Sequence, residues 1–168
     1  MTELKTKYCK RCDRTLPISR FNKNRCSKDG YTFYCKDCIS EYGKKYRSTP
    51  TGIYHLLKGR AGHYDPYEID MTLEEFLEWE KNTPRICVYC DLPEEDIWII
   101  KEYLGSKGDR LTIDCVKPNL YHINNIVWAC DRCNVIKGHQ FTFKQMREIG
   151  QRYVKPYWIK IKEESAIE

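Results

Sequence analysis

Hydrophobic positions in the second half of the chain follow the spacing of two strands and a helix. Residues 111–116 alternate or run apolar as a strand does, and residues 125–129 form a second β-rich run. A helix is expected to begin at residues 134–138, directly after a pair of cysteines, and a longer helix is expected over residues 143–153. This order predicts a strand-strand-helix unit followed by one further helix.

Three helices are expected before this unit. Residues 39–47 and 53–61 suit two short basic helices, and the Pro and Gly within residues 48–52 predict a linker between them. The third helix begins at Thr72, a residue type that caps helices, and it has acidic residues in its first turn. Its apolar side is expected to pack on the unit that follows, through Leu73, Phe76, Leu77 and Trp79.

Cysteine is the most informative residue type in the composition. No apolar run approaches the roughly 20 residues needed to cross a membrane, and the polar start lacks the apolar region of a signal peptide. We therefore expect a reducing, cytoplasmic setting, where cysteines are not held in disulfides. Eight of the ten cysteines form four C-x-x-C pairs, and two such pairs supply the four thiolates of one closed zinc site. The pairs predict two structural zinc ions, one bound by Cys9, Cys12, Cys35 and Cys38 and the other by Cys87, Cys90, Cys130 and Cys133.

Charge is spread unevenly along the chain, whose formal net charge is +5. Residues 1–60 hold 15 Lys and Arg against 5 Asp and Glu, residues 61–108 hold 4 against 12, and residues 109–168 hold 10 against 7. A basic N-terminal third suits a polyanionic partner, although a solvated lysine-rich surface would show the same composition. The side chains expected to contact a polyanion are Arg11, Arg14, Lys23, Arg25, Lys28, Lys58, Arg60 and Lys137. Aromatic residues interleave with the first of these, and packing is the expected role for most of Tyr8, Phe21, Tyr31, Phe33 and Tyr34.

A family resemblance covers about residues 87–138. The stretch 111–114, the stretch 121–130 and the stretch 133–138 together resemble the HNH (ββα-metal) endonuclease motif in its four-cysteine form. The N-terminal cysteine pairs are similar to the zinc-finger prefix of phage-type HNH proteins and of endonuclease VII relatives. The resemblance implies a phage or mobile-element protein that acts in the cytoplasm of a bacterial or phage-infected cell.

The resemblance also implies roles for three residues. By motif position, Asp114 at the end of the first strand and Asn134 after the last cysteine would hold a divalent cation, and Asn125 would fix a loop by hydrogen bonding. Phosphodiester hydrolysis needs a cation to offset charge on the phosphate, and Mg²⁺ or Mn²⁺ prefers oxygen ligands of this kind. The catalytic cofactor expected here is therefore Mg²⁺ or Mn²⁺, in addition to zinc.

The sequence departs from the family at the general base. The family has a histidine directly after the aspartate, where this chain has Cys115. A thiol has roughly the right pKa but exchanges protons through weak hydrogen bonds. Three alternatives stay open: Cys115 acts in catalysis, His122 reaches the site instead, or Cys115 is a small buried residue in a degenerate site.

Together these observations predict an α+β protein with a small zinc-stabilised N-terminal finger and a ββα-metal core with flanking helices. We expect residues 1–48 to form the finger, residues 49–83 a linker and helical segment, and residues 84–168 the nuclease domain. The predicted function is a metal-dependent endonuclease or nickase that acts on double-stranded DNA. The alternative is an HNH-fold zinc protein that binds DNA without cleaving it. RNA binding is a weaker alternative because no RNA-specific motif is present, and the oligomeric state, a homodimer included, stays open.

Overall fold

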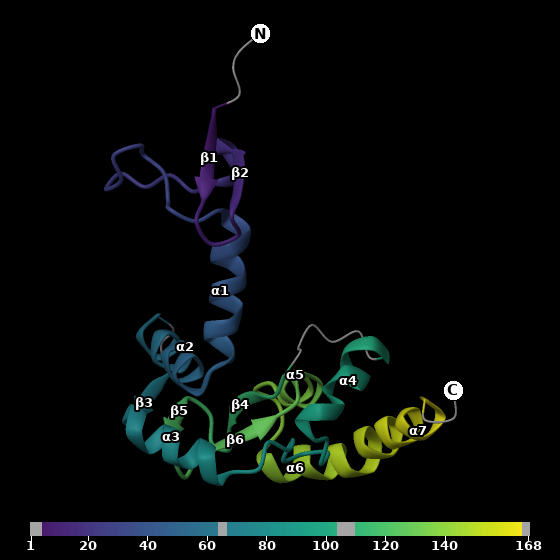
Figure 1. The fold of residues 1–168 in the computed structure, drawn as a ribbon. Coiled ribbons are helices and arrows are strands. Elements are labelled where there is room, and N and C mark those ends of the chain that lie inside the picture. The colour runs from purple at the N-terminus through teal and green to yellow at the C-terminus, as the bar shows by residue number, and fades with distance from the viewer. Residues whose placement is uncertain (1–4, 64–66, 104–109, 166–168) are drawn as a thin grey trace. The chain divides into compact units, whose positions relative to one another are not determined.

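The computed structural model describes residues 5–63, 67–103 and 110–165, and the chain divides into two units, Met1–Leu56 and Leu57–Glu168. The division lies inside a helix rather than in an extended linker. Figure 1 shows the helices and strands of both units.

The first unit is built on a short hairpin and one helix. Strands β1 (Thr6–Cys9) and β2 (Arg14–Pro17) pair antiparallel, with Cys9 opposite Arg14. A tight turn joins them and places Asp13 at a φ of 55°, a left-handed conformation that aspartate tolerates better than most residues. After the 3₁₀ turn η1 (Ile18–Arg20) and a long loop, helix α1 (Lys36–Ser48) begins at the second cysteine pair.

The interior of the first unit is small. Around the first cysteine group, the core consists of three buried cysteines and Phe21, with Leu16 and Tyr31 partly buried against them. The expectation that most of the finger's aromatic residues pack inside was wrong, because Tyr8, Phe33 and Tyr34 are exposed. A unit of this size buries too little surface to enclose more rings.

Helix α2 (Pro50–His63) follows α1 after a single residue, Thr49. Pro50 begins the helix rather than interrupting the chain, because the first helical position needs no backbone donor. The hydroxyl of Thr49 accepts a hydrogen bond from the backbone N of Gly52 at 3.1 Å. A Cβ at Gly52 would lie 1.9 Å from the carbonyl oxygen of Tyr46, so the two helices meet where only glycine fits. The expected linker over residues 48–52 is therefore not extended: its residues form the end of α1, Thr49 and the start of α2.

The second unit contains two pairs of strands. Strand β4 (Thr112–Cys115) pairs antiparallel with β6 (Ile126–Ala129), and helix α5 (Asp131–Lys137) follows β6 directly. The predicted strand-strand-helix unit is thus confirmed, with strand ends one residue from those expected. A second, unexpected pair joins β3 (Glu68–Asp70) to β5 (Leu120–His122) in parallel.

Helices flank this unit on both sides in sequence. Helix α3 (Leu73–Asn82) begins at the predicted cap: the Thr72 hydroxyl accepts from the backbone N of Glu75 at 3.2 Å, and the Glu75 carboxylate accepts from the backbone N of Thr72 at 2.7 Å. The remaining elements are η2 (Glu94–Asp96), α4 (Ile97–Tyr103), α6 (Phe143–Ile149), the π-helical segment η3 (Gly150–Val154) and α7 (Lys155–Ser165).

The C-terminal helix is longer than expected because α6, η3 and α7 run on from one another to residue 165. Its π-helical segment begins at Gly150, where a Cβ would lie 2.4 Å from the carbonyl oxygen of Tyr89. The Trp158 indole also donates to the carbonyl oxygen of Cys90 at 3.1 Å. The helix therefore packs directly on the turn that contains the third cysteine pair.

Two tryptophan rings and an arginine pack together in the core of the second unit. Trp128 is fully buried, with the ring of Trp79 5.3 Å away and the guanidinium of Arg85 4.6 Å from its centroid. Among the described residues, no helix is both long enough and apolar enough to span a membrane.

Candidate active site and metal centres

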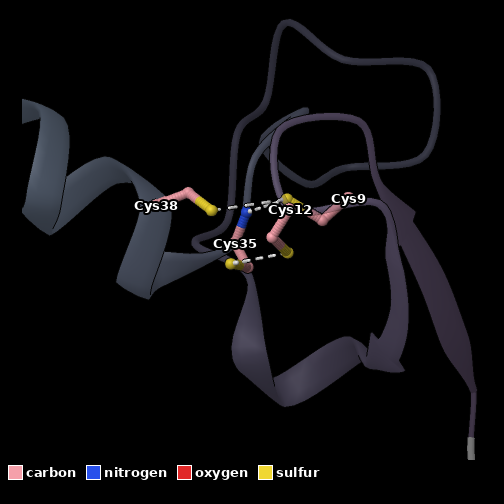
Figure 2. A group of neighbouring side chains, drawn as sticks. All are labelled: Cys9, Cys12, Cys35 and Cys38. Carbon is pink, nitrogen blue, oxygen red and sulfur yellow. Dashed lines mark hydrogen bonds between the residues drawn. The ribbon is translucent and has the colours of Figure 1, made fainter.

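Each unit contains a group of four cysteines whose sulfur atoms converge. In the first unit, Cys9 Sγ lies 3.9 Å from Cys38 Sγ, and Cys12 Sγ lies 4.0 Å from Cys35 Sγ (Figure 2). In the second unit, Cys90 Sγ and Cys130 Sγ are 3.9 Å apart. Within each group all four sulfur atoms lie within 4.8 Å of one another.

These distances suit a tetrahedral metal ion and not disulfides. A zinc ion bonded to four sulfurs at about 2.3 Å separates them by roughly 3.8 Å, whereas a disulfide brings two sulfurs to about 2.05 Å. Backbone N–H groups also point at ligand sulfurs, from Cys35 to Cys9 Sγ at 3.3 Å and from Cys133 to Cys130 Sγ at 3.4 Å. The two groups predicted from the sequence can therefore each hold zinc.

The predicted cation ligands and Cys115 come together at one cavity of about 140 Å³ in the second unit. Strand β4 contributes Asp114 and Cys115, and helix α5 contributes Asn134. The other residues of the lining are Arg60, Tyr67, Ile113, Pro118, Asn119, Tyr121, Lys137, Gly138 and His139.

The Asp114 carboxylate is held by three donors. Its Oδ2 accepts from the Tyr89 hydroxyl at 2.6 Å, and its Oδ1 accepts from Lys137 Nζ at 3.2 Å and from the backbone N of Cys115 at 2.8 Å. Burial, together with the bond to Asp114, raises the pKa of the Tyr89 phenol, so the phenol stays a donor. A carboxylate has roughly four lone-pair sites, so these three donors leave room for one more partner at Asp114.

Lys137 lies deeper than a phosphate-contacting surface lysine would. Lys137 is 5% exposed. Its ammonium donates to the Asp114 carboxylate and to the carbonyl oxygen of Cys115, the latter at 3.0 Å. The ammonium is therefore part of the cavity wall rather than of the outer surface. Its positive charge offsets the negative charge of the Asp114 carboxylate, which would otherwise be buried without a partner of opposite charge.

Two asparagines predicted at the site have different surroundings. Asn134 donates through Nδ2 to the Thr112 hydroxyl at 3.2 Å, so its amide oxygen is the atom that could bind a cation. Asn125 is buried and does not line the cavity. It accepts from the backbone N of Lys117 at 2.9 Å and donates to the carbonyl oxygens of Lys117 at 2.9 Å and Leu120 at 2.7 Å. Its side chain closes the loop between β4 and β5.

The two residues considered as general bases are poorly placed to accept a proton from water. Cys115 is 5% exposed, and burial, with the Asp114 charge adding to it, raises its pKa to about 11. His122 does not line the cavity, and its Nδ1 accepts from the backbone N of Asn124 at 3.2 Å. The pKa of Glu75 is lowered mainly by Thr72 and further by His122, which associates His122 with the start of α3.

The sequence did not predict that Tyr121, Arg60 and His139 would line the cavity beside Asp114. Arg60 hydrogen bonds to Tyr121, whose pKa is raised by burial and held back by that arginine. His139 is exposed at the cavity, one residue after Gly138. In the sequence it comes just after the end of α5 and not next to Asp114, so the HNH motif did not indicate a role for it.

The remaining DNA-contact candidates are exposed. In the first unit these are Arg11, Arg14, Lys23, Arg25 and Lys28, and in the second they are Lys58 and Arg60. Arg14 also hydrogen bonds to Cys12, and the pKa of its guanidinium is raised by that thiol. This contact places Arg14 beside the first cysteine group.

Comparison with known proteins supports the fold. No family model and no curated protein sequence matches the chain. Among solved structures, it is similar to the rare-cutting HNH restriction endonuclease PacI, a protein described as perturbing DNA by an extraordinary mechanism. The TM-score is 0.56 at 22% identity, over 92% of this chain and 97% of the PacI chain. The HNH fold predicted from the sequence is thereby confirmed.

Proposed function

We propose that this chain is a metal-dependent nuclease that hydrolyses phosphodiester bonds in DNA at the Asp114 cavity. One observation carries the proposal: in a fold similar to an HNH restriction endonuclease, Asp114 and Asn134 line a single cavity between β4 and α5. Zinc in the second cysteine group would fix that geometry, because Cys130 and Cys133 border the start of α5. We likewise propose zinc in the first group, duplex DNA as the substrate, and a kinship with phage-type HNH proteins.

Each residue in and beside the cavity would have a separate role. Asp114 and Asn134 offer oxygen ligands that fit Mg²⁺ or Mn²⁺, and such a cation would offset charge on the scissile phosphate and the leaving oxygen. Tyr89 and Lys137 hold the Asp114 carboxylate in a fixed orientation. Arg60 is exposed at the same cavity and is suited to bind a phosphate oxygen.

We assign proton acceptance to His139. Its imidazole is exposed in the cavity lining and has a ring nitrogen that can accept a proton, whereas burial raises the pKa of the Cys115 thiol to about 11. Replacing a positioned base slows a reaction by about 10² to 10⁴. We therefore expect His139→Gln to reduce nicking by that factor, and Cys115→His in the same variant to restore part of it.

The test is nicking of supercoiled plasmid with Mg²⁺ or Mn²⁺. The wild-type chain should convert the plasmid to open-circle or linear DNA, and reactions without added divalent cation should not. Asp114→Asn keeps the size of the side chain and removes its charge, so it should abolish nicking. Glu163→Gln on the exposed face of α7 is the matched control and should nick normally. Nicking that persists in Asp114→Asn would refute this site.

A second candidate function is DNA binding without cleavage. The observation in its favour is that Lys137 already places a positive charge on Asp114, in the region where a cation would bind, beside a buried thiol in place of the usual base. Retained plasmid binding with no nicking under any divalent cation would establish this function instead.

A further inference from the structure

Exposed aromatic residues gather on the first unit, beside one arginine. The residues Tyr34 and Tyr42 are 42% and 56% exposed. The guanidinium carbon of Arg11 lies 5.3 Å from the centroid of the Tyr34 ring and 4.6 Å from that of Tyr42. Arg11 belongs to the turn of the first cysteine pair, and Tyr34 directly precedes Cys35. Both rings are therefore fixed relative to the first cysteine group.

Helix α1 extends this arrangement along its length. Tyr42 and Tyr46 are four residues apart and so lie on one face of the helix. Tyr46 is 37% exposed, and its hydroxyl is 2.6 Å from His55 Nδ1, a contact that fixes the ring. Four residues of helix correspond to a rise of about 6 Å between the two positions. Tyr34, Tyr42 and Tyr46, with Arg11, are called the tyrosine strip below.

The charge of the unit favours a nucleic-acid partner over a protein surface. Residues 1–56 hold 13 Lys and Arg against 5 Asp and Glu. Rings with an exposed face beside cations suit bases joined by phosphates, because the bases stack and the phosphates pair with the cations. The spacing of about 6 Å between ring positions on α1 exceeds the 3.4 Å rise per base in a duplex. It fits a strand whose bases are separated from one another.

We propose that the tyrosine strip binds unpaired bases of single-stranded DNA by stacking, as a binding surface separate from the Asp114 cavity. This inference extends the proposed function, since it takes DNA as the partner. It assigns the first unit a preference for single strands over duplex, in addition to general attraction to phosphate.

The test measures binding of the full zinc-loaded chain to a fluorescent oligothymidylate of about 12 nucleotides, a length within the range of known single-strand sites. Fluorescence anisotropy gives the dissociation constant, without added Mg²⁺ and at one fixed salt concentration. A duplex of equal length is measured alongside. Tyr42→Ala should weaken single-strand binding about 5- to 150-fold, the range that corresponds to loss of one base-aromatic stack. Duplex binding by the same variant should change by less than about twofold, because paired bases are not offered to the ring.

Two control variants separate stacking from other causes. Tyr42→Phe keeps the ring and should bind single strands like the wild type. Tyr153→Ala removes a matched ring of the second unit, 64% exposed with Arg152 5.6 Å from its centroid, and should also leave binding unchanged. Zinc content and circular dichroism establish that each variant is folded.

Several results would overturn the inference. Unchanged single-strand binding in Tyr42→Ala would do so, as would an equal loss for duplex or an equal loss in Tyr42→Phe. A change of molecular mass on gel filtration in Tyr42→Ala would assign the strip to self-association instead. Binding is measured without added Mg²⁺, so it does not depend on cleavage at the Asp114 cavity. Failure of the nuclease proposal would therefore leave this measurement intact, and failure here would leave plasmid nicking intact.

Discussion

Replacing Asn125 should lower the free energy of unfolding of the second unit, without any direct effect on the proposed active site. The Asn125 side chain makes three hydrogen bonds to backbone atoms of the loop after β4. Asn125→Ala leaves those three backbone groups without their partner. A hydrogen bond contributes about 0.5–1.5 kcal/mol net, and part of this loop can be rehydrated, so we expect a loss of about 2–4 kcal/mol in the free energy of unfolding.

Urea unfolding followed by tryptophan fluorescence measures this loss in the correct unit. All four tryptophans lie in the second unit, at positions Trp79, Trp98, Trp128 and Trp158. With a urea dependence of about 1–3 kcal/mol per molar, the midpoint should fall by roughly 1–2 M. Zinc is kept in the buffer throughout.

Two neighbouring substitutions make the measurement specific. Asn125→Asp keeps one acceptor oxygen but sets a negative charge against two carbonyl oxygens, so it should destabilise at least as much as alanine. Asn124→Ala alters an exposed side chain and keeps the backbone bond to His122, so it should change stability by less than about 0.5 kcal/mol. If Asn125→Ala is as stable as Asn124→Ala, the loop-closing role is refuted, and a direct role at the site would be required.

Three further predictions concern metal, pH and packing. Metal analysis of the purified chain should find two zinc ions per molecule, and less than about one would contradict both four-cysteine sites. Because burial raises the pKa of Cys115 from 9.0 to about 11, its contribution to stability is complete below pH 9 and is lost as pH rises through 11. Between pH 9 and pH 11, the free energy of unfolding measured by urea titration should therefore fall by about 2–3 kcal/mol more in the wild type than in Cys115→Ala. An equal fall in both proteins would contradict the raised pKa. Gly150→Ala should lower thermal stability markedly, because its Cβ would lie 2.4 Å from the Tyr89 carbonyl oxygen, and an unchanged melting temperature would refute this contact.

Local features of the chain were predictable from the sequence. The cysteine pairs, the Thr72 cap and the strands over residues 112–115 and 126–129 depend on patterns within a few residues. The parallel pairing of Glu68–Asp70 with Leu120–His122 was not, because each strand has three residues and the two lie far apart in sequence.

The contacts around Asp114 were missed for a related reason. Tyr89 and Lys137 lie 25 and 23 residues from Asp114. No spacing rule links a phenol in a cysteine turn or a lysine at a helix end to that carboxylate. Packing is the sequence-based prediction for most of the finger's aromatic residues, yet Phe33 and Tyr34 are exposed, because sequence alone does not show how small the interior around the first cysteine group is. Contacts between residues far apart in the sequence determine both the partners of Asp114 and the exposure of these rings.

The position of Tyr89 makes the third cysteine pair a structural support for the proposed active site. Tyr89 lies between Cys87 and Cys90, and its hydroxyl is bonded to Asp114. Removal of zinc from this group would free the turn and with it the orientation of the carboxylate. A chelator would then stop cleavage even if it left the reacting cation untouched, so chelation alone cannot count the metals that take part in the chemistry. Omission and re-addition of Mg²⁺ to a zinc-loaded chain separates the two roles.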